Sequence, residues 1–122
     1  IAFIAKLLTR VGGVAIVAAI SPGRRARDWA RAQIGNSVEV YVNCPLEVCI
    51  QRDVKGHYAK AFHGEMPNYA DIYEPPFQPE IVLRTDQESP AESVGKILAG
   101  LAARNLISLT GRQRPGSADW KV

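Results

Sequence analysis

Ser21 stands at a point in the sequence where an anion could bind. It follows an apolar run that ends at Ile20, and Pro22 comes next, so Ser21 separates an expected strand from an expected helix. A helix N-terminus carries a partial positive charge and free N–H groups, which can hold a phosphate or sulfate group. The alternative is that Ser21 only caps its own helix with its hydroxyl group. The residues alone leave both roles open.

A second polar group follows an expected helix over 46–52. The planar guanidinium group of Arg52 could stack on a nucleotide base. The flexible ammonium group of Lys55 could reach a phosphate as a point charge. The alternative is that Arg52 forms a surface ion pair with Asp53, and that Gly56 only ends the helix.

Other kinds of site are poorly supported by the residues present. His57 and His63 have no third ligand nearby, so no metal site is expected. The sequence contains no G-x-x-x-x-G-K-[ST] motif, which is the loop that cradles a triphosphate. Four arginines gather at positions 24, 25, 27 and 31, but no aromatic platform accompanies them. We expect a solvated helix face there and no nucleic-acid partner, although some of the four could face a small anion.

The composition fits an ordinary globular domain. The 122 residues are 47% hydrophobic and 22% charged, with a net charge of +3. The longest apolar run, Val14–Ile20, is far shorter than the ~18 residues of a membrane-spanning helix, so no membrane partner is expected. Two cysteines do not make a disulfide framework, and a reducing, cytoplasmic location is the default.

Alternating strand and helix patterns must position these residues. Val14–Ile20 is rich in β-branched residues, as is typical of a strand covered on both faces. Ser89 and Glu92 form a capping-box pattern, with Pro90 between them. The patterns predict helices over 1–8, 21–34, 46–52 and from 90 onward, and strands over 14–20, 38–43 and 80–85. The fold class is therefore α/β, a parallel sheet flanked by helices, with ligands at the carboxyl ends of its strands.

The segment over about 53–79 does not fit this alternation. It is rich in glycine and proline, contains no strand pattern, and mixes lysines and glutamate with five aromatic residues. Connections longer than ~12–15 residues are usually functional or disordered. We interpret this segment as a lid over a ligand.

The chain opens within a helical pattern rather than at a helix cap. Ile1, Ile4, Ala5 and Leu8 follow the spacing of a buried helix face, and no capping residue precedes them. We therefore expect the C-terminal part of a longer domain over 1–107. Residues 108–122 are polar and rich in Gly and Arg, and we expect a loosely ordered tail there.

Several of these segments together resemble adenylylsulfate kinase. They are Ala18-Ala-Ile-Ser-Pro22, Val38 to Cys49, Gln51-Arg-Asp-Val-Lys-Gly-His-Tyr-Ala-Lys60, Gly64-Glu65, Tyr73-Glu-Pro-Pro76 and Pro79 to Thr85. The resemblance extends from Ile1 to about Ile107. It implies a P-loop kinase fold, of which this chain would carry the C-terminal half. It also implies a phosphotransferase that makes 3′-phosphoadenosine 5′-phosphosulfate (PAPS) from adenosine 5′-phosphosulfate (APS) and ATP with Mg²⁺.

The resemblance also assigns roles to single residues. It implies that Ile20 and Ser21 contact APS, with Ser21 as the candidate catalytic residue, and that Lys55 lies near APS at the base of the lid. Asn68 and Tyr69 fall where a family aromatic ring stacks on the APS adenine. Arg52 and Glu88 would border the ATP adenine.

The same resemblance implies a homodimer, and it raises the possibility of an ATP sulfurylase domain fused to the kinase or associated with it. Two alternatives stay open from the sequence. One is a divergent P-loop kinase for another small hydroxyl substrate. The other is a non-catalytic nucleotide-binding remnant.

Overall fold

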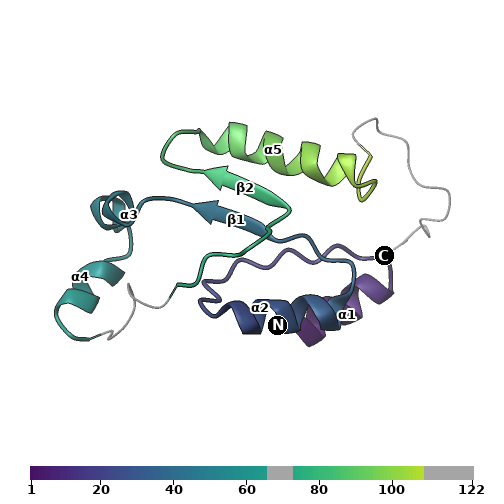
Figure 1. Ribbon diagram of the computed structural model, residues 1–122, viewed down its shortest axis with the longest axis horizontal. Helices are drawn as coiled ribbons and strands as arrows, with labels where there is room; N and C mark the ends of the chain where they lie inside the picture. The colour runs from purple at the N-terminus through teal and green to yellow at the C-terminus, as the bar shows by residue number, and fades with distance from the viewer. Residues whose placement is uncertain (66–72, 109–122) are drawn as a thin grey trace, which may run out of the picture.

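Helices flank a short parallel sheet in the computed structural model, which describes residues 1–65 and 73–108 (Figure 1). The α/β class predicted from the sequence is confirmed. In chain order the elements are α1 (Ala2–Arg10), α2 (Arg24–Ile34), β1 (Val40–Asn43), α3 (Leu46–Arg52), α4 (His57–Phe62), β2 (Ile81–Arg84) and α5 (Pro90–Ala103).

The sheet consists of β1 and β2, which run parallel. Val40 is paired with Ile81 at one end of the ladder, and Asn43 with Arg84 at the other. Ile81 and Leu83 point to one face of β2 and are buried. The helix α5 packs against β2, whereas α1 and α2 pack together on the other side of the sheet (Figure 1). The two strands and α5 therefore form the small apolar core that holds the C-terminal part of the chain.

Local sequence sets the start of α5, as predicted. The Ser89 hydroxyl accepts the Glu92 N–H at 3.3 Å, and the Glu92 carboxylate accepts the Ser89 N–H at 2.7 Å. This reciprocal capping satisfies two backbone donors that would otherwise lack partners. The predicted helix over 46–52 is likewise confirmed as α3.

Two glycines of α5 should respond in opposite directions to the same substitution. A Cβ at Gly95 would meet no atom within 4 Å, so Gly95→Ala should raise the free energy of unfolding by about 0.5–1 kcal/mol through helix propensity. A Cβ at Gly100 would lie 2.7 Å from Cδ1 and 3.0 Å from Cγ1 of the buried Ile81. Gly100→Ala should therefore lower the free energy of unfolding by about 1–2 kcal/mol, because the steric overlap with Ile81 costs more than the gain in helix propensity. Urea denaturation of both variants measures this, and an equal gain at both positions would contradict it.

The predicted strand over Val14–Ile20 is wrong. The structure assigns these residues to no strand, and most of their side chains are exposed, with Ile16 92% accessible to solvent. The chain is extended here and runs below β1 in Figure 1, toward the start of α2. A β-branched sequence fits a strand, but a strand also needs a neighbouring backbone to pair with. Within residues 1–65 and 73–108, only β1 and β2 form such a pair.

The predicted buried face of the first helix is also largely wrong. Ala5 is buried against the rest of the chain, but Ile1, Ile4 and Leu8 are exposed. The helix itself forms over Ala2–Arg10 and packs on α2. Its periodicity is that of a covered helix, yet the described residues cover only a small part of it. The pattern of apolar residues fixes a helix face without supplying the surface that buries it.

Candidate functional site

Three loops that carry the predicted site residues lie at one end of the molecule. The carboxyl ends of β1 and β2 point toward α3, and the chain enters α2 at this same end (Figure 1). Ser21 precedes α2, Arg52 ends α3, and Thr85 and Glu88 follow β2. This placement agrees with the rule that ligands of parallel sheets bind beyond the carboxyl ends of the strands.

Ser21 does not cap α2, so the predicted helix start, with Ser21 as the cap and Pro22 as the first residue, is wrong by two residues. The helix begins at Arg24 with Gly23 in the N-cap position, and Ser21 has φ +40°. The Arg24 N–H instead donates to the Glu74 carboxylate at 2.6 Å, from a residue 50 positions later in the chain. A carboxylate suits this position because the helix N-terminus is partially positive. The Ser21 hydroxyl therefore does not cap α2, and the Glu74 carboxylate takes an N–H group of the helix N-terminus that was expected to hold an anion. A contact between the Ser21 hydroxyl and an anion stays a prediction.

Three of the four clustered arginines, Arg24, Arg27 and Arg31, are half-buried and make contacts within the chain, contrary to the predicted solvated face, whereas Arg25 is exposed as expected. The Arg27 Nε donates to Glu39 Oε1 at 2.9 Å, and Arg31 pairs with both Glu39 and Glu80. The Glu39 N–H also donates to the Glu80 carboxylate at 2.7 Å. These charges join α2 to the residues that directly precede β1 and β2. Spacing along the sequence gave no sign of this, because each partner lies on a different segment.

Glu80 makes the stability of this network pH-dependent. Burial alone would raise the pKa of Glu80, but hydrogen bonds from the Glu39 N–H and the Arg31 guanidinium outweigh it, so the pKa is lowered in the folded chain. A carboxyl whose pKa is lowered by folding stabilises the fold above its unfolded pKa. That contribution is lost as the pH falls through the lowered pKa.

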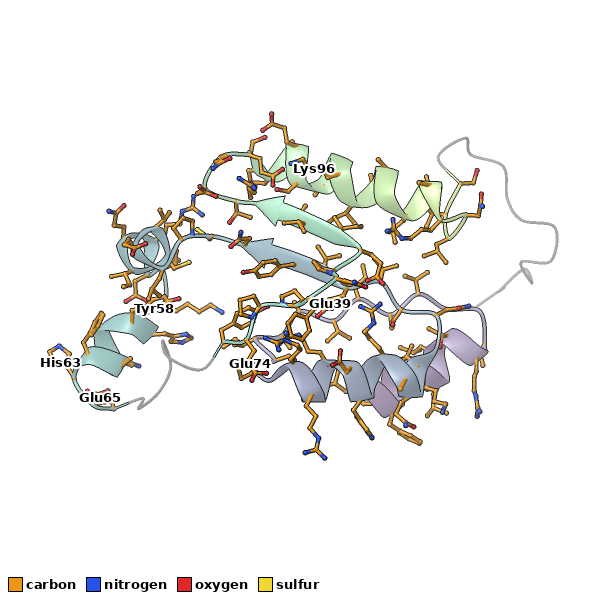
Figure 2. All side chains as sticks on the ribbon, in the orientation of Figure 1. Glu39, Tyr58, His63, Glu65, Glu74 and Lys96 are labelled. Atoms are coloured by element: carbon orange, nitrogen blue, oxygen red, sulfur yellow. The ribbon has the colours of Figure 1, made fainter. Side chains whose placement is uncertain are left out.

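We therefore expect Glu80→Gln to weaken the pH dependence of unfolding on the acid side. The unmodified chain should lose stability as the pH falls from about 5 to about 3, a range that passes through a typical glutamate pKa and continues below it. Glu80→Gln should lower the free energy of unfolding by about 1–2 kcal/mol at pH 7, the scale of a hydrogen bond to a charged group. On acidification, the free energy of unfolding of this variant should fall less than that of the unmodified chain. Exposed Glu65, beyond α4 (Figure 2), provides the matched control Glu65→Gln. Parallel pH curves for the parent and Glu80→Gln would contradict the assignment.

Arg52 and Glu88 meet in one cavity, although they are far apart in sequence. The cavity measures about 440 Å³ and is lined by Arg52, Thr85, Glu88, Pro90 and Ser93. The Arg52 Nη2 donates to the Thr85 carbonyl at 2.8 Å, which holds the guanidinium across the strand ends. Arg52 thus bridges from α3 to the loop after β2 and makes no use of Asp53, its sequence neighbour.

Glu88 and Ser93 give this cavity its polar groups. The Lys96 ammonium lies 2.6 Å from the Glu88 carboxylate and lowers the pKa of Glu88, so that the carboxylate is charged at neutral pH. The Arg84 N–H also donates to Glu88. The Ser93 hydroxyl is buried and has no hydrogen-bond partner in the described residues.

Lys55 and its neighbours form the turn between α3 and α4. Lys55 is exposed, and Asp53 accepts the N–H groups of Tyr58 and Ala59 at 3.2 and 3.0 Å. Asp53 therefore orders the start of α4 rather than forming the surface pair with Arg52. Figure 2 shows α4, with Tyr58 and His63, set apart from the helices α1 and α2. The turn between α3 and α4 lies at the end of the molecule toward which the carboxyl ends of β1 and β2 point (Figure 1).

Several predicted features lie outside the described residues. Asn68 and Tyr69, the proposed contacts to an adenine ring, fall within 66–72, and most of the predicted tail falls within 109–122. The described parts of the expected lid are 53–65, which contains α4, and 73–79.

Neither a metal centre nor a membrane span is found in the described part of the chain. Over 1–65 and 73–108, no three His, Cys, Asp or Glu side chains gather where they could hold a metal ion. No helix among the described residues is long and apolar enough to cross a membrane.

Sequence reasoning missed two residues that organise the site, Arg27 and Glu74. Both act through contacts between segments that are about 50 residues apart. In the sequence, Arg27 is one of four clustered arginines, and Glu74 stands within the segment Tyr73-Glu-Pro-Pro76. Their charges were visible in the sequence, but their partners were not.

Comparisons with known proteins agree on one family. The family model described as adenylylsulphate kinase matches residues 1–84. An adenylyl-sulfate kinase of Halothermothrix orenii is 50% identical over 110 residues, which cover 88% of this chain and 60% of that protein. An adenylyl-sulfate kinase of Rippkaea orientalis is 56% identical over 100 residues, which cover 80% of this chain and 55% of that protein.

A solved structure is also similar to this chain. It is titled "Crystal structure of APE1195", and it matches with a TM-score of 0.71 and 37% sequence identity over 84% of this chain and 59% of that one. The chain thus spans a little over half the length of the proteins that it matches. The similarity runs through the loop of residues 20–23 before α2, called the Ser21 loop below, and through β1, α3 and β2. All four lie within residues 1–84. The chain belongs to the adenylylsulfate kinase family.

Proposed function

We propose that this chain provides the APS-binding and ATP-base-binding part of an adenylylsulfate kinase. The reaction would transfer the γ-phosphoryl group of ATP to the 3′-hydroxyl of APS and give ADP and PAPS. The chain spans 55–60% of the two relatives described above, and the groups that hold the β- and γ-phosphates would come from sequence that these 122 residues do not contain.

One observation carries the proposal. The two residues assigned to the ATP adenine by family resemblance, Arg52 and Glu88, line the same cavity. They reach it from α3 and from the loop after β2, which the parallel pairing of β1 and β2 brings together. An arginine in the lining of this cavity suits a planar base such as adenine, because guanidinium groups stack on aromatic rings.

Each residue of the chain then has a positioning or electrostatic task. Arg52 would stack on the ATP base, while its bond to the Thr85 carbonyl keeps the guanidinium plane in place. Ser21 and Ile20 would contact APS, and Lys55 would offset negative charge near it. Phosphoryl transfer depends mainly on positioning and charge stabilisation, so this division requires no covalent intermediate on Ser21.

The remaining assignments extend the same proposal. Asn68 and Tyr69 would clamp the APS adenine from the lid, with the Tyr69 ring stacked on the base. ATP would bind with Mg²⁺, whose ligands would come from outside the described residues. The protein would act as a homodimer in the cytoplasm, and an ATP sulfurylase, fused or associated, would supply APS.

A chimera tests the proposal. The part of the Halothermothrix orenii protein that precedes the matched region is joined to Ile1 of this chain. We expect the chimera to convert ATP and APS to PAPS, detected by chromatography of the nucleotides. Arg52→Met should raise the KM for ATP roughly 10-fold through loss of the stack, because base stacking contributes about 1–3 kcal/mol.

Three other results would point away from the proposal. Phosphorylation of a different hydroxyl substrate, with APS inert, would favour a divergent small-molecule kinase. A folded chimera that binds nucleotide but transfers nothing would favour a non-catalytic remnant. An unchanged KM for ATP in Arg52→Met would remove Arg52 from the base site.

A further inference from the structure

The backbone of Ser21 has an unusual conformation that something must hold in place. Its φ of +40° lies in the left-handed region, which side chains other than glycine rarely adopt. Such a conformation persists only where the surrounding structure enforces it, and it is common at functional sites. Ser21 is exposed, so side-chain burial does not enforce it.

The guanidinium of Arg27 contacts the backbone at this point. Its Nη1 donates to the Ser21 carbonyl at 2.6 Å and to the Pro22 carbonyl at 3.0 Å. Its Nε donates to the Glu39 carboxylate at 2.9 Å, and the side chain of Arg27 is only 11% exposed. Glu39 is in turn held by Arg31. Glu39 therefore holds the guanidinium in place, and the guanidinium donates hydrogen bonds to two successive carbonyl groups of the Ser21 loop.

The same guanidinium reaches a third segment through Glu74. The Arg27 Nη2 donates to the Glu74 carbonyl at 2.5 Å. The Glu74 N–H donates to the Pro22 carbonyl at 3.0 Å, and the Glu74 carboxylate accepts the Arg24 N–H. Figure 2 shows Glu39 and Glu74 on the side of the sheet that faces α2. All three polar groups of Glu74 are thus directed at residues 22–27.

The residue before Glu74 strengthens this junction. The Tyr73 ring stacks on Tyr41 of β1 at 6.0 Å between centroids, and the Arg27 guanidinium lies 5.3 Å from the Tyr73 ring centroid. Residues 73–75 are therefore fixed to the sheet and to α2, at the C-terminal end of the segment interpreted as a lid.

We propose that Arg27 is a positioning residue: it holds Ser21 in its left-handed conformation and ties the Ser21 loop to residues 73–75. This inference rests on the proposed function, in which Ser21 contacts APS. Arginine is required because one planar group donates here to four acceptors on three segments. A lysine ammonium concentrates its three donors at one point and cannot span them.

Hydrogen–deuterium exchange on the 122-residue chain tests the junction directly. In Arg27→Lys, amide exchange should speed up together in peptides covering 20–27 and 73–78. Exposed Arg25, two positions earlier on the same helix, gives the matched control Arg25→Lys, which should leave both peptides unchanged. Glu39→Gln keeps Arg27 but weakens its anchor, and it should give a smaller change in the same direction. Unchanged exchange in Arg27→Lys and Glu39→Gln would overturn the inference.

Kinetics of the chimera test the positioning role separately. Arg27→Lys should lower kcat/KM for APS roughly 100-fold, the scale of a misplaced reacting group, with the KM for ATP unchanged. A purely structural role would leave the APS parameters intact at temperatures below unfolding, and that result would overturn the inference. If the parent chimera makes no PAPS, the proposed function fails. The exchange experiment then still decides whether Arg27 holds the Ser21 loop.

Discussion

The purified 122-residue chain is expected to form no PAPS from ATP and APS above a protein-free control. Transfer requires a loop of backbone N–H groups and a lysine around the β- and γ-phosphates, and the sequence contains no such motif. The cavity that we propose for the ATP base is lined by Arg52 and Glu88, and one arginine bonded to the Thr85 carbonyl does not replace the donors of such a loop. We therefore expect the chain alone to have no PAPS-forming activity, rather than a reduced fraction of the activity of the chimera.

The measurement compares the chain and the chimera at equal molar concentration, with radiolabelled ATP and chromatographic detection of PAPS. Circular dichroism of both proteins establishes that the chain is folded under the assay conditions. The exposed apolar segment Val14–Ile20 makes detergent-free solubility a necessary check. Formation of PAPS by the chain alone would show that its own residues can bind the triphosphate, and the proposed division of tasks would be wrong.

Substitutions at Ser21 should separate the effect of its hydroxyl group on turnover from the effect of its backbone conformation on stability. Ser21→Gly should leave the melting temperature of the chain unchanged or slightly higher, because glycine adopts a positive φ without steric cost and Ser21 does not cap α2. In the chimera, the same variant should lower kcat/KM for APS roughly 10–100-fold. That is the scale of one lost hydrogen bond to a charged group.

Ser21→Val serves as the contrasting variant. A β-branched residue is strongly disfavoured at positive φ, so Ser21→Val should lower the melting temperature of the chain as well as turnover in the chimera. Unchanged turnover in Ser21→Gly would show that the hydroxyl has no contact with substrate. A fall in melting temperature for Ser21→Gly would show that the hydroxyl has a structural partner after all.

The helix α5 and its start could be predicted from the sequence because their cause is local. Ser89, Pro90 and Glu92 cap each other within one turn, and no distant residue is needed for that arrangement. The α/β class followed for a similar reason, since strand and helix periodicities are readable within short windows. The motifs that carry the family resemblance were also contiguous stretches, such as Gln51 to Lys60.

The start of α2 could not be predicted in this way. Ser21 and Pro22 form a good local capping pattern, yet the helix begins at Arg24 because Glu74, near the C-terminal end of the expected lid, caps it. Two carbonyls that would have joined the first turn are held by Arg27 instead. A tertiary interaction therefore overrides a weak local preference, as is common at functional loops.

The sequence by itself determined the helices α1, α2, α3 and α5, the class of the fold and the family, because capping, periodicity and motif spacing act over a few neighbouring residues. The helix α4, within the segment interpreted as a lid, was not predicted. Only the tertiary structure decided which residues meet: Arg52 with Glu88 in one cavity, and Arg27 with Glu39 and Glu74 around the Ser21 loop. It also decided that Val14–Ile20, with the composition of a strand, is not one. A strand and an ion network both need partners from distant parts of the chain, and only the folded backbone brings those partners within hydrogen-bond distance.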